Sequence, residues 1–269
     1  MLTSYSSVLG ANSLMVFMMA YPFSAVALAA SFLFLSCSSD NKGSDNDPCK
    51  IEYNPKTQFC SDGIVKNKNE FTDARDNKIY RYVEIGGQSW MAENLNYETP
   101  YSKCHDDNPD KCSEYGRLYD WSEAMGIDRE YVVKDNSGFW IILGASNSGN
   151  SQGICPDGWR LPNDNEWQEL VDFIGGDEAG KKLKSKTNNG TDELGFSALP
   201  GGYAVSNPTS GSIEFGSIGA WGNWWSATSL DPRDAKYWAI LNESSGVYSG
   251  KAGKIYNLYS VRCIKNDNS

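Results

Sequence analysis

The sequence predicts an α+β fold in which two or three helices pack on short antiparallel sheets stapled by disulfides. Helical patterns come early in the chain and strand patterns dominate its last third, an order that separates helices from strands. Glycine makes up 26 of the 269 residues and aromatic side chains 13%, which is typical of a turn-rich globular domain. Six cysteines follow an apolar amino-terminal stretch that itself ends in a seventh.

The first elements of the folded domain are expected from about residue 73 onward. Residues 78–85 have the β-branched and aromatic composition of a strand, and residues 88–91 return as its hairpin partner after two glycines. Residues 115–119 indicate another strand. Asp120 then provides an N-cap for a short helix that ends at Gly126.

The clearest helix begins after Asn163. Glu166 lies three residues on, as in a capping box, and apolar residues recur from Trp167 at i+3, i+4 and i+7. Two glycines from Gly175 end this helix, and residues 177–186 predict a second one that Gly180 weakens. Clusters of Gly, Asn, Ser and Pro separate the later predicted strands, which are 196–199, 224–228, 237–241, 246–248 and 259–265.

The first 39 residues contain no charged side chain, and the run from Leu14 to Leu35 is almost continuously apolar. It leads to Cys37, as in a bacterial lipoprotein signal, so residues 1–36 are a predicted signal peptide with Cys37 as the lipidated residue. Residues 37–48 are then a flexible tether. Phe34 stands where leucine is usual and no Lys or Arg precedes the apolar run, so a different start codon or an uncleaved membrane anchor remains open.

Charge and histidine content exclude several classes of function. The chain has 24 basic and 34 acidic residues and a net charge of −10. Without a basic excess, little is gained from releasing counterions at phosphates, so nucleic acid is excluded as a partner. His105 is the only histidine, which excludes a zinc or haem site built on several imidazoles.

Six cysteines remain if the seventh carries lipid, and outside the cytoplasm an even number indicates disulfides. They are Cys49, Cys60, Cys104, Cys112, Cys155 and Cys263. Proximity favours pairing the first two and the next two, which leaves the last two for each other. Another of the 15 possible pairings, or reduced cysteines, remains open. Residues 49–72 then form a short stapled region with too few apolar side chains for a core.

Five blocks of sequence, in order, resemble the Fibrobacter succinogenes major paralogous domain. They are residues 83–96 (VEIGGQSWMAENLN), 115–121 (YGRLYDW), 155–167 (CPDGWRLP and a following EW), 223–228 (NWWSAT) and 260–263 (SVRC). The resemblance covers residues 73–266. It implies an exported bacterial protein, commonly a lipoprotein, in a family without an established biochemical role. The third block is also similar to the formylglycine-generating enzyme family, which implies a C-type-lectin-like fold and supports a Cys155–Cys263 bridge.

No catalytic centre, cofactor or metal is predicted. Formylglycine formation requires a pair of reactive cysteines that bind copper late in the domain, whereas Cys263 is the only late cysteine here. His105 lies in a polar loop and is expected to be a solvated surface residue rather than part of a catalytic triad. Carboxylate pairs suited to glycoside hydrolysis, among Glu166, Glu169 and Asp172, fit the cap and polar side of a helix.

A calcium loop is a weaker alternative. Asp106, Asn108 and Asp110 have the spacing of the first three ligands of such a loop. The sixth position is Lys111 instead of Gly and the twelfth is Arg117 instead of Glu, so the segment is no EF-hand. Weak Ca²⁺ binding by Asp106–Asp110 is left open.

Aromatic residues carry the remaining functional signal. Trp224 and Trp225 are adjacent in a predicted strand and must point to opposite faces, so burial of both competes with ligand binding. Trp221 lies in a glycine-rich loop, where a lectin-like scaffold places binding residues. We therefore expect a non-catalytic, lipid-anchored surface domain of the cell envelope that binds or adheres through Trp221, Trp224 and Trp225, with polysaccharide as the candidate ligand. The alternatives are an assembly role with an envelope protein as partner and, less favoured, an enzyme related to formylglycine formation.

Overall fold

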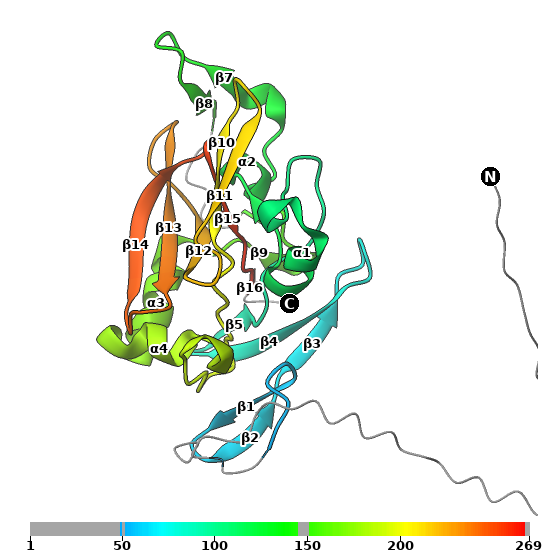
Figure 1. Cartoon of the computed structure of the whole chain (residues 1–269), viewed down its shortest axis with the longest axis vertical. Helices are drawn as coiled ribbons and strands as arrows, with labels where there is room; N and C mark the ends of the chain where they lie inside the picture. The colour runs from blue at the N-terminus through cyan, green and yellow to red at the C-terminus, as the bar shows by residue number, and fades with distance from the viewer. Residues whose placement is uncertain (1–48, 50–51, 145–150, 267–269) are drawn as a thin grey trace, which may run out of the picture. The chain divides into compact units, whose positions relative to one another are not determined.

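A seven-stranded and a five-stranded sheet organise the computed structural model, which describes residues 49, 52–144 and 151–266 (Figure 1). The predicted signal peptide at 1–36, Cys37 and the tether at 37–48 lie outside the described residues. Within those residues, no helix has the length and apolar character needed to cross a membrane. The α+β class and the mainly antiparallel pairing predicted from sequence are confirmed.

The bounds of the elements are as follows. The strands are β1 (Gln58–Ser61), β2 (Ile64–Asn67), β3 (Asn69–Thr72), β4 (Ile79–Ile85), β5 (Gln88–Met91), β6 (Leu118–Tyr119), β7 (Val132–Lys134), β8 (Trp140–Ile142), β9 (Trp159–Arg160), β10 (Tyr203–Asn207), β11 (Ser212–Gly216), β12 (Trp221–Ser229), β13 (Asp234–Leu241), β14 (Val247–Gly253), β15 (Asn257–Ser260) and β16 (Ile264–Lys265). The helices are α1 (Pro109–Tyr115), α2 (Trp121–Ala124), α3 (Asp164–Ile174) and α4 (Ala179–Leu183), with short 3₁₀ turns at His105–Asp107, Arg129–Tyr131, Gly176–Glu178 and Lys186–Asn188.

The larger sheet has the strand order β11-β10-β15-β12-β13-β14, with β6 also paired to β15. Its pairs are antiparallel except for β12 and β15, which run parallel and bring Trp224 opposite Ser260. The five-stranded sheet has the order β3-β4-β5-β16-β9. In it, Ile264 of β16 pairs with both Trp90 and Arg160, so this last strand joins the β4–β5 hairpin to β9, the strand that precedes α3.

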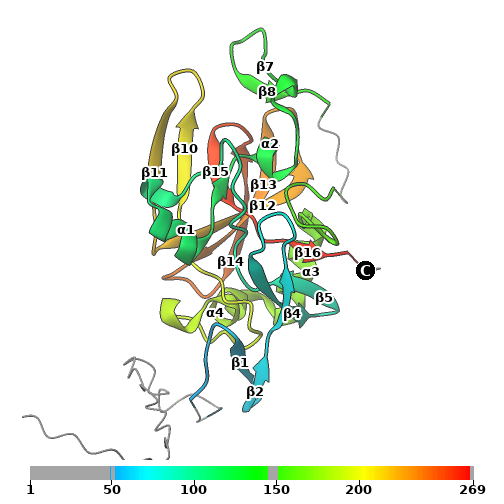
Figure 2. The ribbon, with the colours of Figure 1, turned by 90° about the vertical axis from the view of Figure 1, so that its right-hand side faces the viewer.

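Helix α3 shows why the local sequence folds as predicted. The Asn163 side chain accepts from the Glu166 amide at 3.1 Å, and the Glu166 carboxylate accepts from the Asn163 amide at 2.8 Å. The helix ends at Gly175, whose φ of 99° suits glycine. Trp167, Leu170, Val171 and Ile174 are buried on one face, whereas Phe173 is exposed. Figure 1 and Figure 2 both show the β7–β8 hairpin at one end and the β1–β2 hairpin at the other, with α3 and α4 in the half nearer β1–β2.

Strand β12 serves two separate cores because its side chains alternate between faces. Trp224 packs in one core beside Trp167, with ring centroids 6.1 Å apart. Trp225 packs in the other beside Tyr259, at 4.6 Å. Both indoles are buried. The two side chains therefore point to opposite faces of β12, as expected from sequence, and protein covers both faces.

Three disulfides form among the described cysteines. They pair Cys49 with Cys60, Cys104 with Cys112 and Cys155 with Cys263, as proximity and the family resemblance favour. The third closes 108 residues and holds the entry to β9 against the segment before β16.

Several predicted strands are wrong. Residues 115–119 contribute only β6, because Asn108 caps a helix that starts at Pro109 and runs to Tyr115. Residues 196–199 form only an isolated bridge at Ala198, because Ser197 adopts a φ of 52° that interrupts an extended strand. The β10–β11 hairpin was not predicted.

Candidate functional site

Residues from three of the five sequence blocks, 83–96, 223–228 and 260–263, meet in a buried polar network around Asn94. Its side-chain oxygen accepts hydrogen bonds from Trp224 Nε1 at 2.8 Å and from Arg262 Nη2 and Nε at 2.8 and 3.2 Å. The Arg262 guanidinium is fully buried and also donates to the carbonyl of Phe196, whose ring lies 4.3 Å away. Burial lowers the pKa of Arg262 to about 9. Since all three side chains are enclosed by protein, this network stabilises the fold and presents nothing to a ligand.

A second polar chain ties the amino-terminal region to the domain. Lys68 Nζ donates to Ser197 Oγ at 2.6 Å, and Ser197 Oγ donates to Asp192 Oδ2 at 2.6 Å. Burial raises the pKa of Asp192 to about 6, against the attraction of Lys68. This arrangement anchors Lys68, the single residue between β2 and β3, onto the segment that follows α4.

The tryptophans singled out from sequence divide into two groups. Trp224 and Trp225 are buried, so neither offers a ring face to a ligand, which overturns their suggested binding role. The structure agrees instead with the alternative that both fill the core. Trp221 is 43% exposed at the start of β12, and its ring centroid is 6.2 Å from that of Tyr203.

His105 is buried, contrary to the solvated position expected from its polar neighbours. Its ring lies 5.2 Å from that of Phe215, and its Nε2 is 3.2 Å from the Gly216 carbonyl. The 3₁₀ turn beside the Cys104–Cys112 disulfide folds this side chain against β11, which sequence reasoning did not foresee.

The other acidic candidates have structural partners. Asn108 caps α1 by accepting from the Asp110 amide at 3.0 Å, and over the residues that the structure describes there is no group of three or more His, Cys, Asp or Glu placed to hold a metal. Glu166 belongs to the capping box and pairs with Arg160. Glu169 accepts from Gln88 at 2.8 Å on the surface, and Asp172 accepts from Gln168 one turn away.

Two cavities lie on either side of segment 99–103. We call the first the aromatic cleft, a cavity of about 480 Å³. Its aromatic and aliphatic lining is Tyr101, Val132, Trp140, Ile213, Ile255 and Leu258, and its polar lining includes Lys103, Asp120, Arg129 and Ser206. Strands β7 and β8, the β10–β11 hairpin and β15 supply five of these residues, and the others lie outside these strands, so the site draws on segments far apart in sequence.

The aromatic cleft holds its charged groups in place. Asp120 caps α2 and pairs with Arg129, whose guanidinium lies 4.2 Å from the Tyr101 ring centroid. Trp140 is partly buried, and its Nε1 has no hydrogen-bond partner among the described residues. The cleft thus combines aromatic faces with fixed polar groups, which is the usual composition of a small-molecule site.

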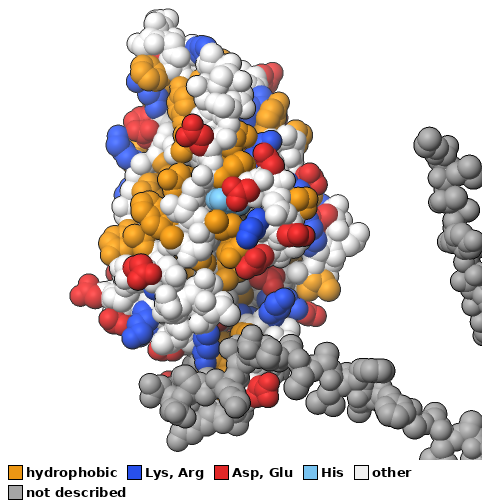
Figure 3. Space-filling view, viewed as in Figure 1, with side chains coloured by type: hydrophobic (Ala, Val, Ile, Leu, Met, Phe, Trp, Pro, Cys, Tyr) orange, Lys and Arg blue, Asp and Glu red, His pale blue; other side chains and the backbone are white. Residues whose placement is uncertain are grey.

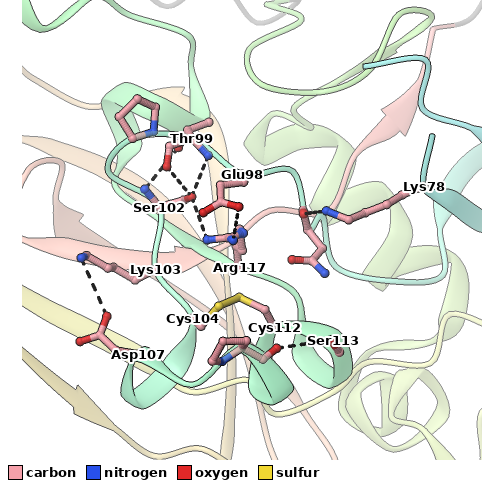
Figure 4. Close-up of a pocket in the computed structure, with 13 residues that line it drawn as sticks. Lys78, Glu98, Thr99, Ser102, Lys103, Cys104, Asp107, Cys112, Ser113 and Arg117 are labelled. Carbon is pink, nitrogen blue, oxygen red and sulfur yellow. Dashed lines mark hydrogen bonds and ion pairs between the residues drawn. A yellow bond between two sulfur atoms is a disulfide. The ribbon is translucent and has the colours of Figure 1, made fainter. Parts of the chain in front are cut away.

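The second cavity, which we call the polar cavity, has a volume of about 820 Å³ (Figure 4). Its charged lining residues are Lys78, Glu98, Lys103, Asp107 and Arg117. Pro100 and Lys103 line both cavities, which makes the cavities neighbours.

The surface charges are mixed: Figure 3 shows acidic and basic side chains interspersed over the face that it displays.

Segment 99–103 is a rigid divider. The Glu123 carboxylate accepts from Thr99 Oγ1 at 2.7 Å and from the Tyr101 amide at 3.1 Å, and Ser102 Oγ accepts from the Thr99 amide at 2.9 Å. Burial raises the pKa of Glu123. The shape of both cavities therefore depends on one partly buried carboxylate in α2.

A family model described as the Fibrobacter succinogenes major domain matches residues 83–265. No curated protein and no solved structure matches the chain. The matched span begins in β4 and ends in β16, so it contains both large sheets except for β3 and the start of β4, together with most of the lining of both cavities.

Proposed function

This chain belongs to the Fibrobacter succinogenes major domain family, and from that premise we propose that it is a non-catalytic, envelope-anchored protein that binds polysaccharide in the aromatic cleft. Its three disulfides indicate an extracytoplasmic protein. Lipid attachment at Cys37 and a C-type-lectin-like scaffold are part of the proposal.

The lining of the aromatic cleft carries this proposal. A sugar ring has apolar C–H faces, which pack on aromatic side chains, and hydroxyls, which need hydrogen-bonding partners. Trp140 and Tyr101 offer the first, while Arg129, which Asp120 holds in place, offers the second. The polar groups are already oriented by protein contacts, so little conformational freedom is lost when a ligand binds.

The exposed pair of Trp221 and Tyr203 is a separate aromatic surface. Neither residue lines the aromatic cleft or the polar cavity. Trp221 therefore remains a candidate contact for a long polymer that extends beyond the cleft, and its contribution is tested independently.

The experiment compares adjacent aromatic residues on one hairpin. The full chain is expressed with export, purified, and run in native gels that contain soluble neutral or acidic polysaccharides. Trp140→Ala should abolish retardation, whereas Phe139→Ala should not, because Phe139 is half-exposed but does not line the cleft. Equal retardation of the parent and Trp140→Ala, or no retardation by any polysaccharide, would reject the proposal. Trp221→Ala in the same gels measures the second surface.

An assembly role is the second candidate, and exposed apolar side chains around the β7–β8 hairpin favour it. Tyr131, Phe139 and Leu143 are each about half exposed there, and neighbouring apolar side chains on a surface are common at protein interfaces. Crosslinking in intact cells distinguishes this role from polysaccharide binding. A protein partner lost with Phe139→Ala and retained with Trp140→Ala would support assembly.

A further inference from the structure

We propose that the polar cavity is a carboxylate-binding subsite in which Arg117 recognises an acidic sugar residue and Glu98 acts as a built-in competitor. This inference rests on the proposed function and narrows its ligand to an acidic polysaccharide. The aromatic cleft would then hold a neighbouring residue of the same polymer.

Arg117 is a nearly buried cation with an exposed counter-ion. Its side chain is 14% exposed, whereas that of Glu98 is 74% exposed, and the pair meets at 2.9 Å. The rest of the guanidinium is poorly satisfied, because Nη1 reaches Ser102 Oγ only at 3.4 Å and Nε has no hydrogen-bond partner within the part of the chain that the structure describes. An ion pair with one so exposed partner contributes little to stability and is easily exchanged. A ligand carboxylate can therefore replace Glu98 at little cost.

The other charges of the cavity favour the same ligand. Lys78 and Lys103 lie on either side of Arg117, as Figure 4 shows. Lys103 is held only loosely, with Nζ 3.8 Å from Asp107. The charged lining thus has three cations and two carboxylates, Glu98 and Asp107, in a chain whose net charge is −10. Lys78 also pairs with Asp76 at 2.9 Å, so removing Glu98 from its pair leaves Arg117 as the unbalanced positive charge of the cavity.

The geometry of Arg117 points to a carboxylate in particular. A guanidinium presents a planar fork that matches the two oxygens of a carboxylate, and such paired bonds are stronger than neutral hydrogen bonds. Lys103 lines both cavities, so one extended chain can place a uronic acid at Arg117 and another sugar ring at Trp140. Two adjoining cavities therefore suit a polymer better than a single small anion.

The test uses the exported full chain with two probes, oligogalacturonide as the acidic ligand and xylo-oligosaccharide as the neutral one, measured by calorimetry. Glu98→Gln should bind oligogalacturonide about five-fold more tightly, the upper range for one exposed ion pair. Glu178→Gln is the matched control, since Glu178 is an exposed residue paired with Lys181 at 3.9 Å that lines neither cavity. Arg117→Gln should weaken binding about 10- to 100-fold.

The outcomes separate this inference from the proposed function. Equal affinities of Glu98→Gln and Glu178→Gln for oligogalacturonide would overturn the inference even if Arg117→Gln proved unstable. Tight binding of the neutral probe alone would overturn it while leaving polysaccharide binding intact. No binding of either probe would overturn both. Binding of monomeric galacturonate as tight as that of the oligomer would show a free-anion site and refute the polymer ligand.

Discussion

Replacing Asn94 with alanine should destabilise the fold by about 3–5 kcal/mol, the range expected when a buried charged group loses a partner. One side-chain oxygen accepts three hydrogen bonds, two from Arg262 and one from Trp224. The alanine variant leaves all three donors in an environment that water does not reach, since both donor side chains are buried.

The magnitude follows from the separate losses. Each bond from the charged guanidinium contributes about 1.5–3 kcal/mol, and an indole N–H left unpaired costs about 1–3 kcal/mol. Arg262 keeps its bond to the Phe196 carbonyl and its contact with the Phe196 ring. We therefore take a value below the simple sum, because relaxation towards the remaining partners recovers part of the loss.

The assay is urea unfolding of the oxidised protein followed by tryptophan fluorescence, which reports on the buried tryptophans of both cores together. Gln168→Ala is the control, because its side chain makes one 2.8 Å hydrogen bond at the surface of α3, to Asp172. Its free energy of unfolding should stay within about 0.5 kcal/mol of the parent. A loss below 1 kcal/mol for Asn94→Ala would refute the view that this network stabilises the fold.

Three other changes have measurable consequences. Replacing Cys155 and Cys263 together with alanine should lower the free energy of unfolding by about 4–5 kcal/mol, because their bridge closes 108 residues; an unchanged urea midpoint would contradict this. Asp192 has a folded pKa raised from 3.8 to about 6, so its proton stabilises the fold fully below pH 4 and this contribution is lost as the pH rises through 6. The stability of the parent relative to Asp192→Asn should therefore fall by about 3 kcal/mol between pH 4 and 7, and a flat difference would argue against the raised pKa. Glu166→Ala removes the carboxylate that accepts from the Asn163 amide in the capping box and that pairs with Arg160, and should cost about 2–4 kcal/mol by thermal unfolding, against less than 0.5 kcal/mol for Glu169→Ala.

The sequence predicted an element correctly where the residues that determine its structure all lie within one short segment. Helix α3 has its cap, apolar face and terminal glycine within 13 residues of sequence, from Asn163 to Gly175, and it folds as predicted. The hairpin of β4 and β5 likewise contains its own turn. Strand β10 is different, because its pairing with β15 lies far along the chain and its hairpin with β11 has a polar turn.

The aromatic cleft could not be predicted from the sequence, because it too depends on contacts between distant segments. Trp140 and Tyr101 carry no sequence signal of their own, and the partners that make them a cleft come from strands distant in the chain. The adjacent tryptophans at 224 and 225 gave a visible signal, but composition cannot tell an indole that fills a core from one that binds a sugar. His105 was misplaced because its burial comes from β11, which lies more than 100 residues away.

The two cores that share β12 make the domain a single cooperative unit. Trp224 and Trp225 are neighbours in the chain, yet each closes a different hydrophobic core. Opening either core pulls on the same backbone, so neither half can unfold while the other keeps its strand. The amide protons of β12 should therefore exchange with solvent only when the whole domain opens. If such a domain is pulled from its two ends, it would then unfold in one step at a single threshold force, without a partly unfolded intermediate.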